Sequence, residues 1–230
     1  MINEKLFNPS GVVVVGGSDD VNKPGGAVLR NLLQSPFKGQ AYVVNPKADS
    51  VQGVKSYHAV EELPQVDCAI IAVAAKFCLH AVEVLAREKG TRAFVILSAG
   101  FGEENEEGAE LERRIVEVID SVGGALIGPN CTGLLTTNYN GSFTSPVPQL
   151  DPKGVDFISG SGATAIFIVD NGMRKGLKFN SVWSVGNSAQ IGVEEALEYL
   201  DESFDPEHSS RIKLLYIESI GDPQKFLRHA

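Results

Sequence analysis

Uninterrupted apolar runs, each followed by residues typical of turns, constrain the fold of this 230-residue chain more than any other feature. The run at residues 11–15 is one glycine and four valines, and similar runs lie at 41–44, 68–73, 93–97 and 125–127. Strands without a polar face are buried on both sides, as in parallel sheets covered by helices. Helices predicted at 26–35, 77–88 and 111–122 separate these strands. The first half of the chain is therefore predicted to form a doubly wound parallel sheet.

The second half of the chain follows the same plan after a change in composition between residues 138 and 154. Pro146, Pro148 and Pro152 indicate a linker, or a return strand followed by a linker. Strands are predicted at 155–158, 181–185 and 212–217, with helices at 163–173 and 193–200. Three parallel strands make a thin sheet, since flavodoxin-like domains have about five. We therefore expect an α/β chain with a Rossmann-like parallel-sheet domain at residues 1–146 and a truncated flavodoxin-like α/β domain at 152–230. That second domain is either a fragment or is completed by a partner chain.

The charge of the chain restricts its partners. Its formal net charge is −9, from 20 basic and 29 acidic residues, which argues against nucleic acid or an anionic membrane as the partner. No apolar run reaches the roughly 18 residues of a membrane span, and the N-terminus lacks the pattern of a signal peptide. We expect a cytoplasmic protein in which a polyanionic ligand would need basic groups placed close to it.

Three cysteines, Cys68, Cys78 and Cys131, are odd in number and lack C-x-x-C spacing. They are predicted to be reduced thiols of the core, as is usual in the cytosol. Cys131 follows Pro129 and Asn130, and the alternative interpretation is that it acts as a catalytic nucleophile. A catalytic thiol needs a base, however, and none of the four histidines lies in a recognisable motif. We favour a small residue that lets a ligand approach closely.

The turn after the first strand, Gly16-Gly17-Ser18, departs from the G-x-G-x-x-G fingerprint of dinucleotide-binding domains, because Ser18 replaces the second glycine. The loop is also longer than a tight Rossmann turn. A loop of this length would allow several amides and Lys23 to surround a pyrophosphate. The alternative is a structural loop without a ligand, since an isolated glycine motif is a weak signal.

The turn after the second strand, Asn45-Pro46-Lys47, separates coenzyme A (CoA) from NAD as the expected ligand. A site for NAD has Asp or Glu near this point, which binds the ribose 2′-hydroxyl. Lys47 favours a phosphate instead, either the 2′-phosphate of NADP or the 3′-phosphate of CoA. A single lysine in a turn is more often a solvated surface residue than a phosphate ligand. The other turns of the chain are what favour a bound phosphate here.

Two further turns are predicted to present helix N-termini to an anion. Ser161 and Gly162 follow a strand and precede a helix, and residues 186–189, which include Asn187, are predicted to be a second helix start. Each helix N-terminus stabilises an anion by roughly 0.3–1 kcal/mol, and free amides add charge-assisted hydrogen bonds. The glycine spacing around Ser161 does not match a nucleophile elbow. This part of the sequence predicts a site for an oxyanion or a phosphoryl group.

Acidic residues give weaker signals. Glu218 ends the last predicted strand, on the side of the sheet where ligands bind, and is placed to orient a histidine; a surface acid is the alternative. The acidic stretch at 103–107 contains no histidine and no ligand spacing. We therefore predict a solvated approach to a helix there, and no metal site.

Taken together, the turns resemble the CoA-binding part of the NDP-forming acyl-CoA synthetases, which include the ADP-forming acetyl-CoA synthetases and the alpha subunit of succinyl-CoA synthetase. The matching segments occur in order over nearly the whole chain, at residues 12–18, 42–47, 98–102, 128–133, 157–163, 184–187 and 215–218. The resemblance implies a CoA-binding Rossmann-like domain and a flavodoxin-like ligase domain. It also implies a histidine that carries a phosphoryl group between an acyl phosphate and ADP.

The resemblance implies roles for individual residues. Ser161, Gly162 and Asn187 would face the phosphohistidine, and Glu218 would hold it. The family often has glutamine where Gly160 stands, and Lys and Asp where Ser188 and Gln190 stand. The CoA site would be lined by loop residues, namely Gly16, Gly17, Ser18, Lys23, Asn45, Lys47, Val73, Ala99, Asn130 and Cys131.

The phosphorylated histidine of the family lies some tens of residues beyond the position of Glu218, and His229 is too close and in a different sequence context. We expect this chain to be part of an enzyme that converts acyl-CoA, ADP and phosphate to acid, CoA and ATP, and to be inactive alone. ATP, ADP and Mg²⁺ are expected only with an ATP-grasp domain or beta subunit, and the full-length form is expected to be an oligomer. The alternatives are a non-catalytic CoA-binding regulatory module and, less favoured, an NAD(P)-dependent oxidoreductase.

Overall fold

A seven-stranded sheet forms the first half of the chain in the computed structural model, which describes residues 2–207 and 209–230. Its strand order is β3-β4-β2-β1-β5-β6-β7, and every pairing is parallel except that of β3 with β4. The predicted doubly wound parallel sheet is confirmed. The strands are β1 (Gly11–Val15), β2 (Gln40–Val44), β3 (Ser50–Val51), β4 (Val54–Tyr57), β5 (Cys68–Ile71), β6 (Ala93–Ile96) and β7 (Ala125–Ile127).

A second, five-stranded sheet has the order β12-β10-β11-β8-β9. Its strands are β8 (Gly133–Leu135), β9 (Asn140–Ser142), β10 (Leu150–Ser159), β11 (Phe179–Ser184) and β12 (Lys213–Tyr216). The three predicted parallel strands correspond to β10, β11 and β12, while β8 and β9 pair antiparallel. Residues 133–142 lie before the predicted boundary at 146 yet pair with this second sheet, and the boundary itself stays a prediction.

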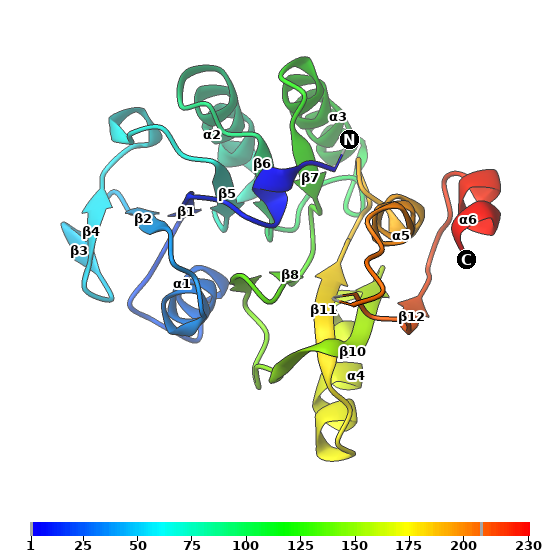
Figure 1. Cartoon of the computed structure of the whole chain (residues 1–230). Helices are drawn as coiled ribbons and strands as arrows, with labels where there is room; N and C mark the ends of the chain where they lie inside the picture. Colours follow the sequence, from blue (N-terminus) through cyan, green and yellow to red (C-terminus); the bar gives the residue numbers. More distant parts are fainter. Residues whose placement is uncertain (1, 208) are drawn as a thin grey trace.

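Helices cover both sheets (Figure 1). Helices α2 (Ala75–Glu88) and α3 (Glu106–Ser121) pack together, whereas α1 (Pro24–Gln34) contacts β9. Helix α3 begins five residues before its predicted start, because Asn105 caps it by accepting a hydrogen bond from the backbone N–H of Gly108 at 2.8 Å. The other helices are α4 (Gly162–Arg174), α5 (Val193–Glu202) and α6 (Pro223–His229), with single turns at Glu4–Leu6 and Val60–Glu62.

One hydrophobic core joins the two sheets. Alternate residues of β1 face opposite sides, so that Val13 and Val15 pack under α2 and α3 while Val12 and Val14 belong to a cluster that also contains Ile158 and Trp183 of the second sheet. The two halves of the chain therefore bury part of their apolar surface against each other. Among the described helices, none is long and apolar enough to cross a membrane.

Candidate functional site

The turns at the carboxyl edge of the first sheet contact one another in one continuous row. Asn45 Nδ2 donates to the carbonyl of Gly17 at 2.8 Å, and Gly16 lies against Val73, whose Cγ1 would be 2.8 Å from a Cβ at position 16. The hydroxyl of Ser98 donates to the carbonyl of Val73, and the carbonyl of Ser98 accepts from Asn130 N at 2.8 Å. The row crosses five neighbouring strands, in the order β2, β1, β5, β6 and β7. The four spacings between them, at about 4.8 Å each, make the row about 19 Å long. It includes Ala99, the next residue after Ser98.

The glycine loop is held in place by a residue that the sequence did not single out. Gln52, in the turn between β3 and β4, donates from Nε2 to the carbonyls of Ser18 at 2.7 Å and Gly26 at 2.8 Å. Gly16 has φ +88°, and a Cβ there would lie 2.7 Å from the carbonyl oxygen of Ala72, so only glycine fits. These contacts hold the long loop against the start of α1 and the turn between β3 and β4. The sequence did not reveal this contact, because Gln52 lies 34 residues from Ser18 along the chain.

The two predicted basic residues lie on this row. Lys47 follows Asn45, whose Oδ1 accepts from Lys47 N at 2.9 Å, and its side chain has no ion pair within the described residues. Lys23 is the residue before α1 and lies 3.9 Å from Asp20, with both side chains exposed. Both cations are therefore available to a ligand at the cost of at most one weak surface pair.

A cavity of about 610 Å³ lies where this row meets the second sheet. It brings together six of the predicted residues, whereas Gly16, Gly17, Ser18, Lys23, Asn45, Lys47, Val73 and Ala99 do not line it. Asn130 belongs to both the row and the cavity and so connects them. The six are Asn130, Cys131, Ser161, Gly162, Asn187 and Glu218.

Helix α4 points its N-terminus into this cavity. Ser161 caps the helix, since its Oγ accepts from Thr164 N at 3.4 Å. The first amides of the helix, on Gly162 and Ala163, have no intrahelical acceptor and are free to bind an anion. A Cβ at Gly162 would lie 2.8 Å from Thr132 Cγ2, so the helix start and this threonine are in close contact.

Thr132 is a cavity residue that the sequence analysis did not name. It is 3% exposed and lines the cavity, yet its Oγ1 has no hydrogen-bond partner in the described part of the chain. A buried hydroxyl without a partner is costly, which makes a ligand atom the natural partner. Its only sequence signal was its place in the matching segment at residues 128–133, and no role was assigned to it there.

The predicted helix start at residues 186–189 is wrong. Helix α5 begins at Val193, and residues 186–189 form a turn in which Gly186 has φ +57°. A Cβ at Gly186 would lie 2.2 Å from the carbonyl oxygen of Pro129, so glycine lets this turn pack directly on the Pro129-Asn130 turn of the first sheet. The backbone N–H of Asn187 donates to that same carbonyl at 3.0 Å. The turn joins the two sheets and presents no helix N-terminus.

The side chain of Asn187 is fully used within the protein. Its Nδ2 donates to Glu103 Oε2 at 2.5 Å and to Glu112 Oε2 at 2.9 Å, while its Oδ1 accepts from Asn130 Nδ2 at 3.3 Å. The stretch at 103–107 is exposed and leads into α3, as predicted, and Glu103 in addition lines the cavity. Burial acts to raise the pKa of Glu103, but hydrogen bonds from Asn187 and from the N–H groups of Gly100 and Phe101 outweigh it and lower that pKa.

Cys131 is a core thiol. It is 3% exposed, donates from Sγ to the carbonyl of Ile96 at 3.3 Å, and burial raises its pKa to about 12. It is protonated at neutral pH, which removes the alternative of a nucleophile. Cys68 and Cys78 are likewise free and buried, as predicted.

Glu218 follows β12 and lines the cavity. A Cβ at Gly160 would lie 3.4–3.6 Å from Glu218 atoms, so the absence of a side chain at Gly160 leaves space beside the carboxylate. His58, His80 and His229, the histidines that the structure describes, do not line the cavity. His229 instead hydrogen-bonds Asp201 at 2.8 Å.

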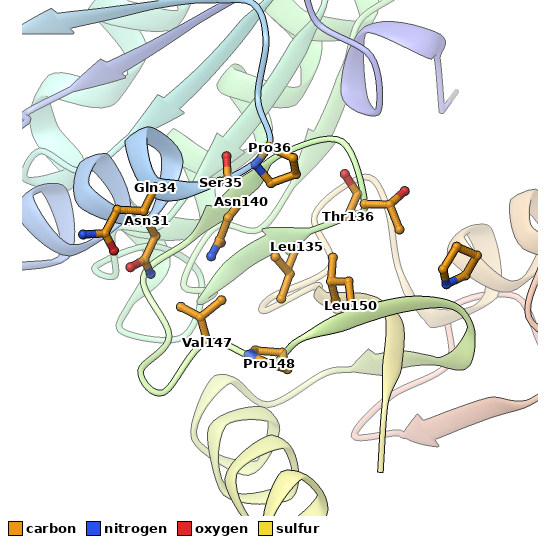
Figure 2. A pocket seen from close by; sticks show the side chains of 12 residues that line it. Asn31, Gln34, Ser35, Pro36, Leu135, Thr136, Asn140, Val147, Pro148 and Leu150 are labelled. Carbon is orange, nitrogen blue, oxygen red and sulfur yellow. The ribbon is translucent and has the colours of Figure 1, made fainter. Parts of the chain in front are cut away.

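A separate cavity of about 500 Å³ lies between α1, β8 and the proline-containing segment (Figure 2). Asn31 and Gln34 line it from α1, and Val147 and Pro148 line it from the opposite side. No charged side chain is among its described lining residues. Its lining includes the C-terminal end of α1 and no helix N-terminus, whereas the cavity that contains Glu218 has the free amides at the start of α4, so we assign the candidate site to that cavity.

Two family models match the chain. The model described as CoA binding domain matches residues 10–137, and the model described as succinyl-CoA ligase like flavodoxin domain matches residues 152–230. The chain belongs to the NDP-forming acyl-CoA synthetase family. The resemblance carried by the turns is therefore confirmed.

Curated members of the acyl-CoA synthetase family match nearly all of the chain. It is 39% identical over 98% of its length to the alpha subunit of acetate–CoA ligase [ADP-forming] II of Pyrococcus furiosus, and spans 48% of that protein. It is 39% identical over 99% of its length to acetate–CoA ligase [ADP-forming] I of Archaeoglobus fulgidus, and spans 32% of that protein. The chain thus corresponds to between about a third and a half of these synthetases.

A solved synthetase structure shares the arrangement of both sheets. The apo form of the dinucleotide-forming acetyl-coenzyme A synthetase 1 of Ca. Korarchaeum cryptofilum superposes with a TM-score of 0.85 at 35% identity, covering 96% of this chain and 47% of that one. The order of the two domains is therefore that of the synthetase family.

Proposed function

We propose that this chain is the CoA-binding, alpha-subunit-like portion of an ADP-forming acyl-CoA synthetase. The reaction of the whole enzyme would be acyl-CoA plus ADP and phosphate to acid, CoA and ATP. The observation that carries the proposal is the junction at Asn130, where the row of turns along the first sheet enters the cavity between the sheets. A long ligand with a charged end and a reactive end fits such a row, since one end can lie at Lys47 while the other reaches the cavity.

CoA would lie along the carboxyl edge of the first sheet, with its 3′-phosphate at Lys47. Lys23 and the amides of the glycine loop would bind the pyrophosphate, because loop amides and a helix N-terminus favour negative charge. The net charge of −9 makes these local cations necessary. Val73, Ala99 and Asn130 would line the path toward the cavity.

The cavity residues would bind the phosphoryl group. The amides of Gly162 and Ala163 would donate hydrogen bonds to it, and Thr132 Oγ1 would gain the partner it lacks within the described protein. Ser161 would fix the helix start, and Asn187 would position the two turns. Glu218 would accept a hydrogen bond from one nitrogen of the family's phosphohistidine, which leaves the other nitrogen as nucleophile.

The proposal includes partners for the whole enzyme. An ATP-grasp domain or beta subunit would bind ATP or ADP with Mg²⁺, and the phosphohistidine would come from sequence beyond Glu218. A cytoplasmic location and an oligomeric full-length form belong to the same proposal. We expect the purified chain to form no acyl-CoA from ATP, acetate and CoA, because none of the described histidines lines the cavity.

Calorimetry with CoA, dephospho-CoA, NAD and NADP tests the CoA site. We expect CoA to bind more tightly than NAD or NADP. Lys47→Ala should weaken CoA binding by roughly 10–100-fold and dephospho-CoA binding much less, because a charge-assisted hydrogen bond contributes about 1.5–3 kcal/mol. Lys38→Ala, an exposed lysine on another loop, is the matched control and should change neither affinity. NAD binding at least as tightly as CoA would contradict the proposal. If Lys47→Ala lost the same affinity for CoA and for dephospho-CoA, Lys47 would not bind the 3′-phosphate.

A further inference from the structure

Helices α5 and α6 pack side by side beside the second sheet (Figure 1). Their contact brings Glu198 and Glu202, one turn apart on α5, together with His229 on α6. One ligand atom of each residue lies within 4.8 Å of the others. None of the three lines the cavity that contains Glu218.

His229 is oriented so that one ring nitrogen faces the carboxylates. Its side chain is 8% exposed, and its Nδ1 is 2.8 Å from Asp201 Oδ2, a pairing that places the ring proton on Nδ1 because a carboxylate can only accept. Nε2 is buried without a hydrogen-bond partner in the described residues, and Glu198 Oε1 is 3.7 Å from it. A cation between them would satisfy both groups, since an imidazole nitrogen and a carboxylate oxygen are both metal ligands. A carboxylate behind a histidine is also the arrangement that orients metal ligands.

The neighbouring lysine leaves this arrangement open. Lys225 Nζ lies 3.2 Å from Glu198 Oε2 and 3.0 Å from Glu195 Oε1, so it occupies the other oxygen of Glu198. Oε1 stays directed at His229. Glu202 is exposed, and its side chain can therefore move toward the other two.

We propose that Glu198, Glu202 and His229 bind a divalent transition-metal ion such as Zn²⁺. One imidazole and two carboxylates favour such an ion over Mg²⁺ or Ca²⁺, which prefer oxygen ligands alone. Tetrahedral zinc with bonds of about 2.0–2.1 Å places its ligands about 3.4 Å apart, so the group must contract from its present spacing. The ion would tie α6 to α5 and would have a structural role independent of CoA binding. The sequence analysis predicted no metal site because the ligands come from two helices.

Isothermal titration of EDTA-treated protein with ZnCl₂ tests the site. We expect one tight equivalent per chain, lost or weakened at least tenfold in Glu202→Gln and His229→Gln. Asp201→Asn should weaken binding by about 10–100-fold, the usual effect of removing a residue that orients a metal ligand. His80→Gln is the matched control, because His80 Nε2 also lies 2.8 Å from a carboxylate, that of Glu61, at an exposed position. Equal zinc binding in the parent and in Glu202→Gln and His229→Gln, or no stoichiometric binding by the parent, would overturn the proposal.

Thermal unfolding gives a second readout. Zn²⁺ at a hundredfold excess over its Kd should raise the Tm of the parent by roughly 5–10 °C, and should leave that of His229→Gln unchanged. CoA affinity should be the same in both proteins. A Tm of His229→Gln that rises as much as the parent's would place the metal elsewhere, whereas loss of CoA binding alone would count against the proposed function and not against this site.

Discussion

Asn187 joins the two halves of the molecule through one side chain. It hydrogen-bonds Asn130 beside β7 and both Glu103 and Glu112 near the start of α3, residues that lie between 57 and 84 positions away in the chain. Its role is therefore to position the Pro129-Asn130 turn, and the phosphoryl group would be contacted by neighbouring amides.

Replacing Asn187 with alanine should raise the pKa of Glu103 toward its ordinary value. The amide that favours the ionised carboxylate is lost, while burial continues to favour the neutral form. Because the Glu103 pKa is lowered in the folded protein, its stabilising contribution is present above its unfolded pKa and is lost as pH falls through the folded pKa. The free energy of unfolding of the variant should therefore fall less on acidification than that of the parent. Carboxyl ¹³C NMR titration of Glu103 measures it, with Asn171→Ala, an exposed residue bonded only within α4, as control; an unchanged Glu103 pKa would contradict this assignment.

Cys131 should resist alkylation in the folded protein. With the pKa raised to about 12 by burial, the thiolate fraction at pH 8 is about 10⁻⁴. We expect no iodoacetamide labelling of Cys131 at pH 8 without denaturant, and complete labelling in urea. Peptide mass spectrometry locates the label. Rapid modification of the native protein would mean that the cavity reaches the sulfur.

A buried carboxylate, that of Asp156, links three strands of the second sheet. Asp156 on β10 is fully buried and accepts from Lys213 Nζ on β12 at 2.6 Å, and from Asn180 and Ser181 on β11 at 2.8 and 2.6 Å. A carboxylate on the central strand of three thus satisfies groups on both neighbours. This network fixes the strand register from which the loop with Glu218 projects.

Asp156→Ala should destabilise the protein by about 3–5 kcal/mol, because it leaves the ammonium group of Lys213 without its buried partner. Urea unfolding followed by circular dichroism measures the change. Asp151→Ala removes an acid paired with Lys178 at 2.9 Å near the start of the same strand and should barely move the midpoint, since surface pairs contribute little. Similar midpoints for both variants would show that the buried network contributes no more than the exposed pair.

At the scale of the whole molecule, the N-terminal segment binds the second half of the chain. Phe7 stacks on Tyr199 with ring centroids 4.5 Å apart and lies 5.2 Å from Trp183. The hydroxyl of Tyr139 donates to the carbonyl of Leu6 at 2.9 Å. Because one hydrophobic cluster also spans both sheets, the two halves should unfold together.

Phe7→Ala should destabilise the protein by about 3 kcal/mol through lost aromatic packing, without separating the two halves. Fluorescence of Trp183, the only tryptophan, reports on the second sheet, while far-UV circular dichroism reports on the whole chain. The two transitions should coincide in the parent and in the variant. Leu227→Ala, at an exposed position, serves as control. Separate transitions in the parent would contradict a shared core.

The sequence determined the order and type of the main strands and helices, the two-domain plan and the family, because these depend on local patterns. Apolar runs without alternation predict buried parallel strands, and turn residues follow each strand at fixed positions. It also identified six of the residues that line the cavity.

Tertiary structure alone decided the contacts between segments far apart in the chain. The short strands β8 and β9 form because Gly133 of β8 pairs with Ser184 of β11. Gln52, in the turn between β3 and β4, holds the glycine loop by a hydrogen bond to Ser18. The turn at 186–189 is not a helix because Gly186 packs on Pro129, a contact with no local sequence pattern. The unpartnered hydroxyl of Thr132 and the meeting of His229 with Glu198 and Glu202 arise in the same way. Local propensity acts over a few residues, whereas burial and hydrogen bonding are satisfied by whichever segments the fold brings together.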